Sequence, residues 1–132
     1  MKRGARTWRA AAAAWAVVIV VFGVIPTQQI VSAAAPDHEI ASTLTGHFME
    51  YFVLAALISA TWAGRSGWIP GAAVTLTLAV GLGAMIELVQ AFLPYRDSQA
   101  IDVLVNAAGA ACGVAVFSVV SKVVGRRRSR RP

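Results

Sequence analysis

Four long apolar stretches limit what this chain can fold into. They cover about residues 8–25, 46–63, 71–93 and 100–124. Each is close to the roughly 20 apolar residues that a helix needs to cross a bilayer. Because 58% of the 132 residues are hydrophobic and only 14% are charged, the chain carries more apolar surface than one soluble core of this length can bury. We therefore predict an all-α integral membrane bundle of four transmembrane helices, forming a single domain over residues 1–132.

The basic residues predict the orientation of this bundle. Ten of the twelve Lys and Arg residues lie within the first nine positions or after position 121. Cytoplasmic segments of membrane proteins are enriched in Lys and Arg, and an even number of spans places both termini on one side. We therefore expect cytoplasmic N- and C-termini. The basic tail at 125–132 is expected to contact anionic membrane lipids, and we predict no nucleic-acid partner.

The first apolar stretch has a second interpretation. A basic start, an apolar run and the small residues Ala33, Ala34 and Ala35 resemble a secretory signal peptide with its cleavage site. The apolar run is long for such a peptide, however, and the alanines lie well beyond its end. We therefore expect the first helix to be retained, and N-terminal sequencing of the mature protein tests this expectation.

Polar side chains gather in the halves of the later spans that face the outer side. The second stretch carries them in its first turns, the third in its last turns, and the fourth again in its first turns. Residues three or four apart share a helix face, so each group points in one direction. Three separate parts of the sequence thus reach the same depth. The predicted polar site comprises His47, Glu50, Tyr51, Glu87, Gln90, Arg96, Ser98, Asp102 and Asn106.

The charges of this predicted site do not balance. Glu50, Glu87 and Asp102 face one permanent cation, Arg96, together with the titratable His47. Carboxylates inside a bilayer cost free energy unless they meet donors, water or a cation. Either a carboxyl group is protonated, or a cation or cationic group completes the site. The alternative without a ligand is a polar network that only holds the helix ends together.

A metal ion is the lesser alternative for the missing positive charge. His47 and Glu50, opposite Glu87 and Gln90, form a pattern similar to the paired carboxylate and histidine ligands of metal-binding helical bundles. Only one histidine is present in this pattern, whereas a transition-metal site of that kind uses more. We therefore predict no metal and no cofactor.

Several small residues predict close helix packing. Gly109 and Gly113 form a small-xxx-small pattern on one face of the fourth stretch, where glycine lets two backbones approach. Gly81 and Gly83 in the third stretch have the same interpretation. Cys112 is expected to be a small packing residue, since no second cysteine is present for an intramolecular disulfide.

The polar and small residues together carry a family resemblance. The motif positions are His47, Phe48, Tyr51, Glu87, Gln90, Phe92, Pro94, Arg96, Ser98, Asp102, Asn106, Gly109 and Gly113. Over about residues 46–117 this pattern resembles the signature of VanZ-like membrane proteins. Many relatives have Asp-Lys shortly before the histidine, whereas residues 43–46 of this chain are Thr-Leu-Thr-Gly, which leaves Arg96 more isolated as a counter-charge. The resemblance implies a small multi-pass protein of the bacterial plasma (inner) membrane. The founding member is linked to low-level resistance to the glycopeptide teicoplanin, so envelope maintenance or glycopeptide resistance is the implied field of function.

These features favour an outward-facing polar pocket that recognises the headgroup of an envelope lipid or a lipid-linked cell-wall intermediate, or a partner protein that handles one. Arg96 would hold a phosphate or carboxylate, Glu87, Asp102 and His47 would bind cationic or hydroxyl groups, and Gln90 and Asn106 would orient them. A version with catalysis uses a protonated glutamate and His47 as acid and base. The sequence has no serine nucleophile beside a base, no phosphate loop and no zinc motif, which argues against an enzyme.

Two other functions stay open. One is a proton- or cation-linked transport component, because acids within spans often mark ion paths. Against it, the inner halves of the helices offer no polar route onward, and four helices would have to oligomerise to form a pore. The other is a structural accessory that stabilises a larger envelope complex.

Overall fold

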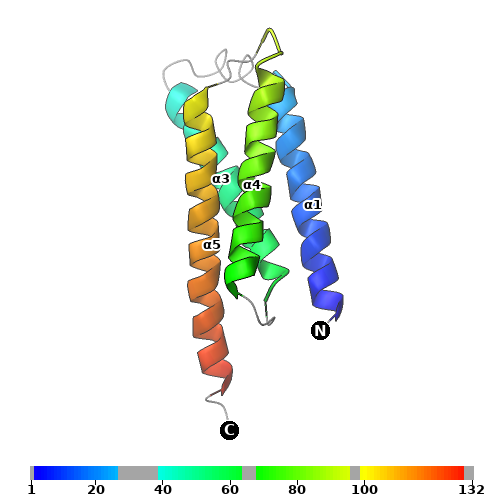
Figure 1. The fold of residues 1–132 in the computed structure, drawn as a ribbon, viewed down its shortest axis with the longest axis vertical. Coiled ribbons are helices and arrows are strands. Elements are labelled where there is room, and N and C mark those ends of the chain that lie inside the picture. Colours follow the sequence, from blue (N-terminus) through cyan, green and yellow to red (C-terminus); the bar gives the residue numbers. More distant parts are fainter. Residues whose placement is uncertain (1, 27–38, 64–67, 96–98, 130–132) are drawn as a thin grey trace.

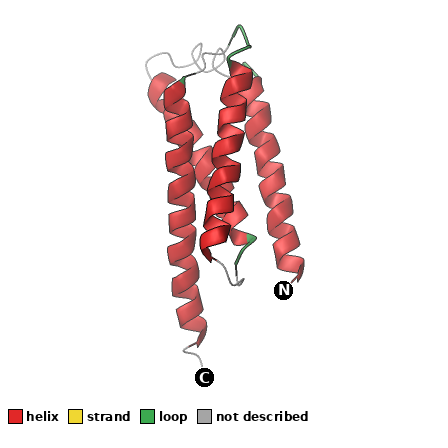
Figure 2. Ribbon diagram, in the orientation of Figure 1, coloured by secondary structure: helices red, strands yellow, loops and turns green. Residues whose placement is uncertain are grey.

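The residues that the structure describes form four long α-helices. The computed structural model describes residues 2–26, 39–63, 68–95 and 99–129, and these residues contain no strand (Figure 2). The helices are α1 (Lys2–Val24), α3 (Glu39–Ala60), α4 (Trp68–Gln90) and α5 (Ala100–Ser129) (Figure 1). Each contains a segment of at least 18 residues that is long and apolar enough to cross a membrane. The prediction of an all-helical protein with four such helices is therefore confirmed.

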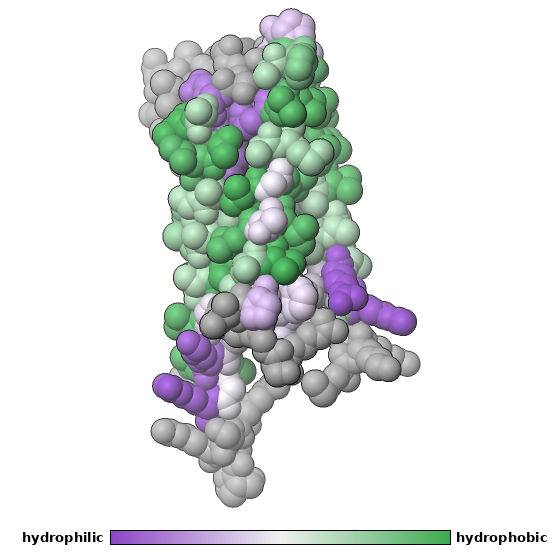
Figure 3. Space-filling model, viewed as in Figure 1, coloured by the Kyte–Doolittle hydropathy of each residue, from purple (hydrophilic) through white to green (hydrophobic). Residues whose placement is uncertain are grey.

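The two chain termini lie at the same end of the bundle (Figure 1). Within the described residues, every Lys and Arg belongs to the start of α1 or the last turns of α5, and therefore lies at this terminal end. Figure 3 shows hydrophilic residues at both ends of the molecule and an apolar band between them. Large apolar side chains such as Leu78, Met85 and Leu104 point outward and are more than half exposed. This exterior fits a lipid environment, because no described residue covers these side chains.

The helix ends differ from the ends of the apolar stretches: α1, α3 and α4 begin earlier and α5 ends later, whereas α1, α3 and α4 end before their stretches do. Helix α3 begins at Glu39 rather than at 46, and α5 continues to Ser129 rather than 124. Glu, Lys and Arg are good helix formers, and adding residues to an existing helix is favourable, so the helix outlasts the apolar run. Helix α4 ends at Gln90 rather than 93, where tighter turns lead the chain to Pro94.

Helix α3 is the centre of the packing, and its closest neighbour is α5. A Cβ atom built on Gly109 would overlap the carbonyl oxygen of Phe48, and one built on Gly113 would overlap the carbonyl oxygen of Phe52. The two contacts are one helical turn apart on both helices, so α3 and α5 run in the same direction with their backbones in contact. Glycine permits this approach, and its Cα–H groups point at the carbonyl oxygens, a contact that recurs between helices.

Helix α1 is tied to α3 and α4 by hydrogen bonds as well as by apolar packing. The Trp15 indole N–H donates to the Glu50 carbonyl oxygen at 2.9 Å. The Gln90 side-chain amide donates to the Gly23 carbonyl oxygen, also at 2.9 Å. Between these two bonds, Ile19 is buried in the core. Retention of this segment in the mature protein stays a prediction, but in this fold α1 is an integral part of the bundle.

Two residues expected in helix packing lie elsewhere. Nothing lies within 4 Å of a Cβ atom built on Gly81, which is exposed on α4. Cys112 is exposed on α5, although it stands between the packed glycines in sequence. Both predictions were wrong for the same reason. A small residue in an apolar helix can face lipid as easily as a neighbour, and composition alone does not give the rotation of a helix about its axis.

Candidate functional site

Three ionisable side chains from three different helices meet at the end of the bundle opposite the termini. They are His47 on α3, Glu87 on α4 and Asp102 on α5, and one nitrogen or oxygen atom from each lies within 4.8 Å of the other two. Among the described residues this is the one such group of His, Cys, Asp or Glu side chains. We call these three residues the polar cluster.

Each helix brings its member of the polar cluster to this end in a different way. Asp102 lies in the first turn of α5, and its backbone N–H donates to the Gln99 carbonyl oxygen at 2.9 Å. A negative side chain in a first turn gains about 0.3–1 kcal/mol from the helix dipole. Glu87 lies in the last turn of α4, and His47 lies about two turns into α3. Because α4 runs antiparallel to α3 and α5, its last turn lies level with their first turns (Figure 1).

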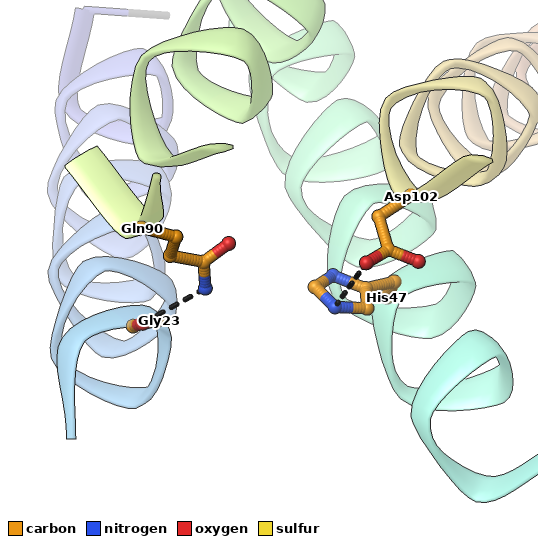
Figure 4. A network of polar contacts seen from close by, with 4 residues as sticks. All are labelled: Gly23, His47, Gln90 and Asp102. Carbon is orange, nitrogen blue, oxygen red and sulfur yellow. Dashed lines mark hydrogen bonds and ion pairs between the residues drawn. The ribbon is translucent and has the colours of Figure 1, made fainter. Parts of the chain in front are cut away.

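The two carboxylates of the polar cluster are buried although they lie near helix ends, and His47 is half-buried. Glu87 is 5% exposed and Asp102 is 6% exposed. The Nε2 atom of His47 lies 3.9 Å from an Asp102 carboxylate oxygen, which is an ion pair when the imidazole is protonated (Figure 4). This distance is longer than the roughly 2.7–3.2 Å of a direct hydrogen bond. The two groups therefore face each other without a direct hydrogen bond between them.

A second layer of residues closes the polar cluster on the side of the bundle interior. Tyr51 follows His47 by four residues, Gly83 precedes Glu87 by four, and Asn106 follows Asp102 by four, so each lies one turn deeper. A Cβ atom built on Gly83 would lie 3.0 Å from the Asn106 side-chain nitrogen and 3.3 Å from the Tyr51 ring, so the three residues touch. We call them the floor layer.

The floor layer separates the polar cluster from an apolar core. Tyr51 is 1% exposed and Asn106 is 2% exposed, so neither is in contact with lipid or water. The Asn106 side-chain oxygen is buried, and no described residue offers it a hydrogen bond. Directly beyond the floor layer lie the buried apolar side chains Leu54, Ala55, Ala79, Ala110 and Val114. The buried polar side chains Ser59, Thr61 and Thr75 lie nearer the terminal end. A ligand of the polar cluster would therefore enter from the end of the bundle, not through its middle.

The charges within the polar cluster oppose each other. When both are ionised, the Glu87 and Asp102 carboxylates repel by at least about 3.5 kcal/mol, taking their 4.8 Å limit and an effective dielectric constant of about 20. The described Lys and Arg residues are at the other end of the molecule and do not offset this repulsion. A protonated His47, a bound proton or a cationic group is needed to stabilise the pair.

The structure separates the nine predicted site residues into groups. His47, Glu87 and Asp102 form the polar cluster, and Tyr51 and Asn106 belong to the floor layer. Arg96 and Ser98 lie outside the described residues.

Two members of the predicted site are placed differently. Glu50 is only half-buried, and its carboxylate is not part of the polar cluster; its backbone carbonyl accepts the Trp15 N–H. Gln90 is buried at 3% exposure, but its amide N–H points away from the polar cluster toward α1 and donates to Gly23 (Figure 4). Gln90 therefore fixes α1 against α4 in the structure, a role that the sequence did not suggest.

Gly83 is the position that sequence reasoning undervalued. Its predicted role in close helix packing is confirmed, and the residues that it meets are Tyr51 and Asn106, directly beneath the polar cluster. Its spacing from Glu87 was the available signal, because a residue four positions before Glu87 shares its helix face. Trp15 was also missed, since a tryptophan inside an apolar run gives no indication of which backbone carbonyl it will meet.

Comparison with known proteins agrees with this architecture. No curated protein and no solved structure matches the chain. The family model described as VanZ/LLP1 matches residues 8–121, which include all four membrane-spanning segments in whole or in large part, the polar cluster and the floor layer. The chain therefore belongs to the VanZ/LLP1 family and is a helical, membrane-type member of it.

Proposed function

We propose that this protein binds the polar headgroup of an envelope lipid or of a lipid-linked cell-wall intermediate at the polar cluster. The observation that carries the proposal is the convergence of the half-buried His47 and the buried Glu87 and Asp102 from three helices into one group. Ionisable residues within membrane segments are costly and are retained chiefly where they serve a function. A lipid is the fitting class of ligand, because its headgroup lies at the depth of a helix end.

The chemistry of the polar cluster favours a ligand rich in hydrogen-bond donors. Ionised carboxylates only accept hydrogen bonds, and imidazole accepts or donates according to its protonation. Glu87 and Asp102 would thus bind hydroxyl or ammonium groups of the headgroup, and His47 would bind either kind of group. The Asn106 side-chain oxygen adds an acceptor one turn deeper. Arg96, in the segment between α4 and α5, would hold the phosphate or carboxylate of the same ligand.

The orientation that this proposal requires places the polar cluster at the outer face of the bacterial plasma membrane. The basic residues at the terminal end support cytoplasmic termini. Arg96→Cys in a Cys112→Ala background tests it with a membrane-impermeant maleimide, since the native thiol is exposed. Labelling on intact cells is expected. Labelling only after the cells are opened would place Arg96 in the cytoplasm and refute the outward site.

Lipid analysis tests the binding itself. The full chain is purified in a mild detergent, and retained lipids are identified by mass spectrometry for wild type, Glu87→Gln, Asp102→Asn and the control Gln99→Ala. Gln99 is exposed at the same end, and its contact with α5 uses only its backbone. We expect one enriched lipid class in wild type and control and its loss from both cluster variants at normal protein level. Loss of protein level together with lipid would instead indicate that the cluster is only structural.

The transport alternative is less well supported than binding. A transported proton or cation needs polar groups along its whole path, and the apolar side chains beneath the floor layer provide none. Buried polar residues nearer the terminal end, such as Thr75 and Thr61, donate to carbonyl groups of their own helices. Uptake of a proton or cation by purified protein in sealed vesicles, abolished in Asp102→Asn, would reverse this preference.

A further inference from the structure

The geometry points to a divalent transition-metal ion bound by His47, Glu87 and Asp102. The inference rests on the polar-headgroup site proposed above, because the ion would use the same three side chains. It departs from the sequence argument, which counted one histidine and paired it with Glu50. The structure instead supplies a third helix and a third ligand, Asp102.

The distances in the polar cluster suit a shared ion better than direct bonds. Zinc holds nitrogen and oxygen ligands at about 2.0–2.2 Å, so two ligands of one tetrahedral ion lie about 3.3–3.6 Å apart. The His47 Nε2 to Asp102 oxygen distance of 3.9 Å is close to this value, and all three donor atoms lie within 4.8 Å of one another. Displacements of the three donor atoms by a few tenths of an ångström to about 1 Å would bring them to coordination distance without a change of fold.

The ligand types select the class of metal. Imidazole favours Zn²⁺, Fe²⁺ and similar ions, whereas carboxylates also suit Mn²⁺ and Mg²⁺. A site with one imidazole and two carboxylates therefore prefers the borderline ion Zn²⁺, or the harder Mn²⁺, over Mg²⁺. The single cysteine, Cys112, is exposed on α5 and is not part of the group, so the site lacks the thiolate that would select Cu⁺.

The charges of the ligand set match those of a divalent ion. Two ionised carboxylates carry two negative charges, and a divalent ion neutralises both while binding His47 in its uncharged form. Neither partner of the His47–Asp102 pair is exposed by more than 16% of its side chain.

Three protein ligands leave at least one coordination position open. Sites of this composition hold a water molecule or a substrate oxygen at that position. The floor layer closes the inner side of the polar cluster, so the open position faces the end of the bundle. A phosphate or hydroxyl oxygen of a lipid headgroup could bind there. The ion would then convert an acidic cluster into a site that accepts an anionic headgroup.

Metal titration of the full chain tests the inference. The protein carries a tag without histidine, is stripped with a chelator in detergent, and is titrated by calorimetry with Zn²⁺, Mn²⁺ and Mg²⁺. Wild type and the control Gln99→Ala are expected to bind one Zn²⁺ or Mn²⁺ per chain, and Mg²⁺ more weakly. His47→Gln and Asp102→Asn are expected to weaken binding by at least about tenfold. X-ray absorption on the zinc-loaded wild type should show one imidazole and two carboxylate ligands, which requires no variant to fold.

Any other outcome of the metal titration overturns the inference. Binding of no ion in stoichiometric amount, equal binding by the variants, or tighter binding of Mg²⁺ than of Zn²⁺ and Mn²⁺ would exclude this site. Stoichiometric binding that appears only in Arg96→Gln would show that the guanidinium, not an ion, balances the carboxylates. The lipid analysis distinguishes this failure from that of the proposed function. If chelator-treated protein still retains the lipid, the metal inference fails and headgroup binding stands. If the protein binds zinc but no lipid is enriched, headgroup binding fails and the metal inference stands.

Discussion

Replacing Gly109 with alanine tests how the contact between α3 and α5 holds the polar cluster. The new Cβ would overlap the Phe48 carbonyl oxygen and would lie 3.1 Å from the Phe48 carbonyl carbon. Carbon atoms in favourable contact are about 3.5–4.0 Å apart, so the helices must separate by about 0.5 Å or more. Overpacking of this kind costs about 1–3 kcal/mol, and alanine returns about 0.5–1 kcal/mol through its higher helix propensity. The expected net loss of stability relative to wild type is about 0–2.5 kcal/mol.

The chain provides a matched control for this substitution. Gly81 is also a helical glycine in a membrane-spanning segment, but a Cβ atom built on it meets nothing within 4 Å. Gly81→Ala should therefore be stabilised by the higher helix propensity of alanine, with no cost from overpacking. Thermal unfolding in detergent, followed by fluorescence-detected size-exclusion chromatography, should show Gly109→Ala several degrees below Gly81→Ala.

The same substitution should reach the polar cluster. His47 is next to Phe48 in sequence, so moving α5 away from that carbonyl lengthens the 3.9 Å gap between His47 and Asp102. Lipid retention should fall in Gly109→Ala and persist in Gly81→Ala. If Gly109→Ala is as stable as Gly81→Ala and retains the same lipid, the tight contact between α3 and α5 is wrong, and so is its role in positioning the cluster.

Three further substitutions have defined outcomes. Trp15→Phe removes the donor to the Glu50 carbonyl and should lower stability by about 0.5–1.5 kcal/mol in the same thermal assay, with unchanged lipid retention. Gln90→Leu removes the hydrogen bond to the Gly23 carbonyl and should cost a similar amount; equal melting temperatures would show that this bond does not hold α1. Gly83→Ala places a methyl group 3.0 Å from the Asn106 side chain and 3.3 Å from the Tyr51 ring, and should reduce lipid retention more than stability, whereas normal retention would contradict a tightly packed floor layer.

The helices were predictable because their signal is long and uninterrupted. Four apolar runs of about 20 residues admit few structures other than membrane-spanning helices. The ends of the helices were less predictable. Hydropathy indicates where a segment leaves the lipid, whereas a helix ends where its backbone hydrogen bonding ends. Helix α5 thus continues through Lys122 to Ser129, well into the basic tail.

The membership of the polar cluster was only partly predictable. A spacing of three or four places residues on one helix face, but it does not say which neighbour that face meets. His47 and Glu50 share a face by this rule, yet only His47 reaches Asp102. The rotation of α3 is set by the backbone contacts at Gly109 and Gly113, which lie far from His47 in sequence. Such long-range packing is not encoded in any local pattern.

Native mass spectrometry of the intact chain tests the central claim most directly, namely that the polar cluster is a binding site. Wild type and Asp102→Asn are released from the same mild detergent and their bound masses are compared. The account predicts that folded wild type carries a defined additional mass, from a lipid or a lipid with an ion, and that equally folded Asp102→Asn has lost it. Identical bound masses in the two proteins, or none in either, would contradict the claim and leave the cluster as a packing feature.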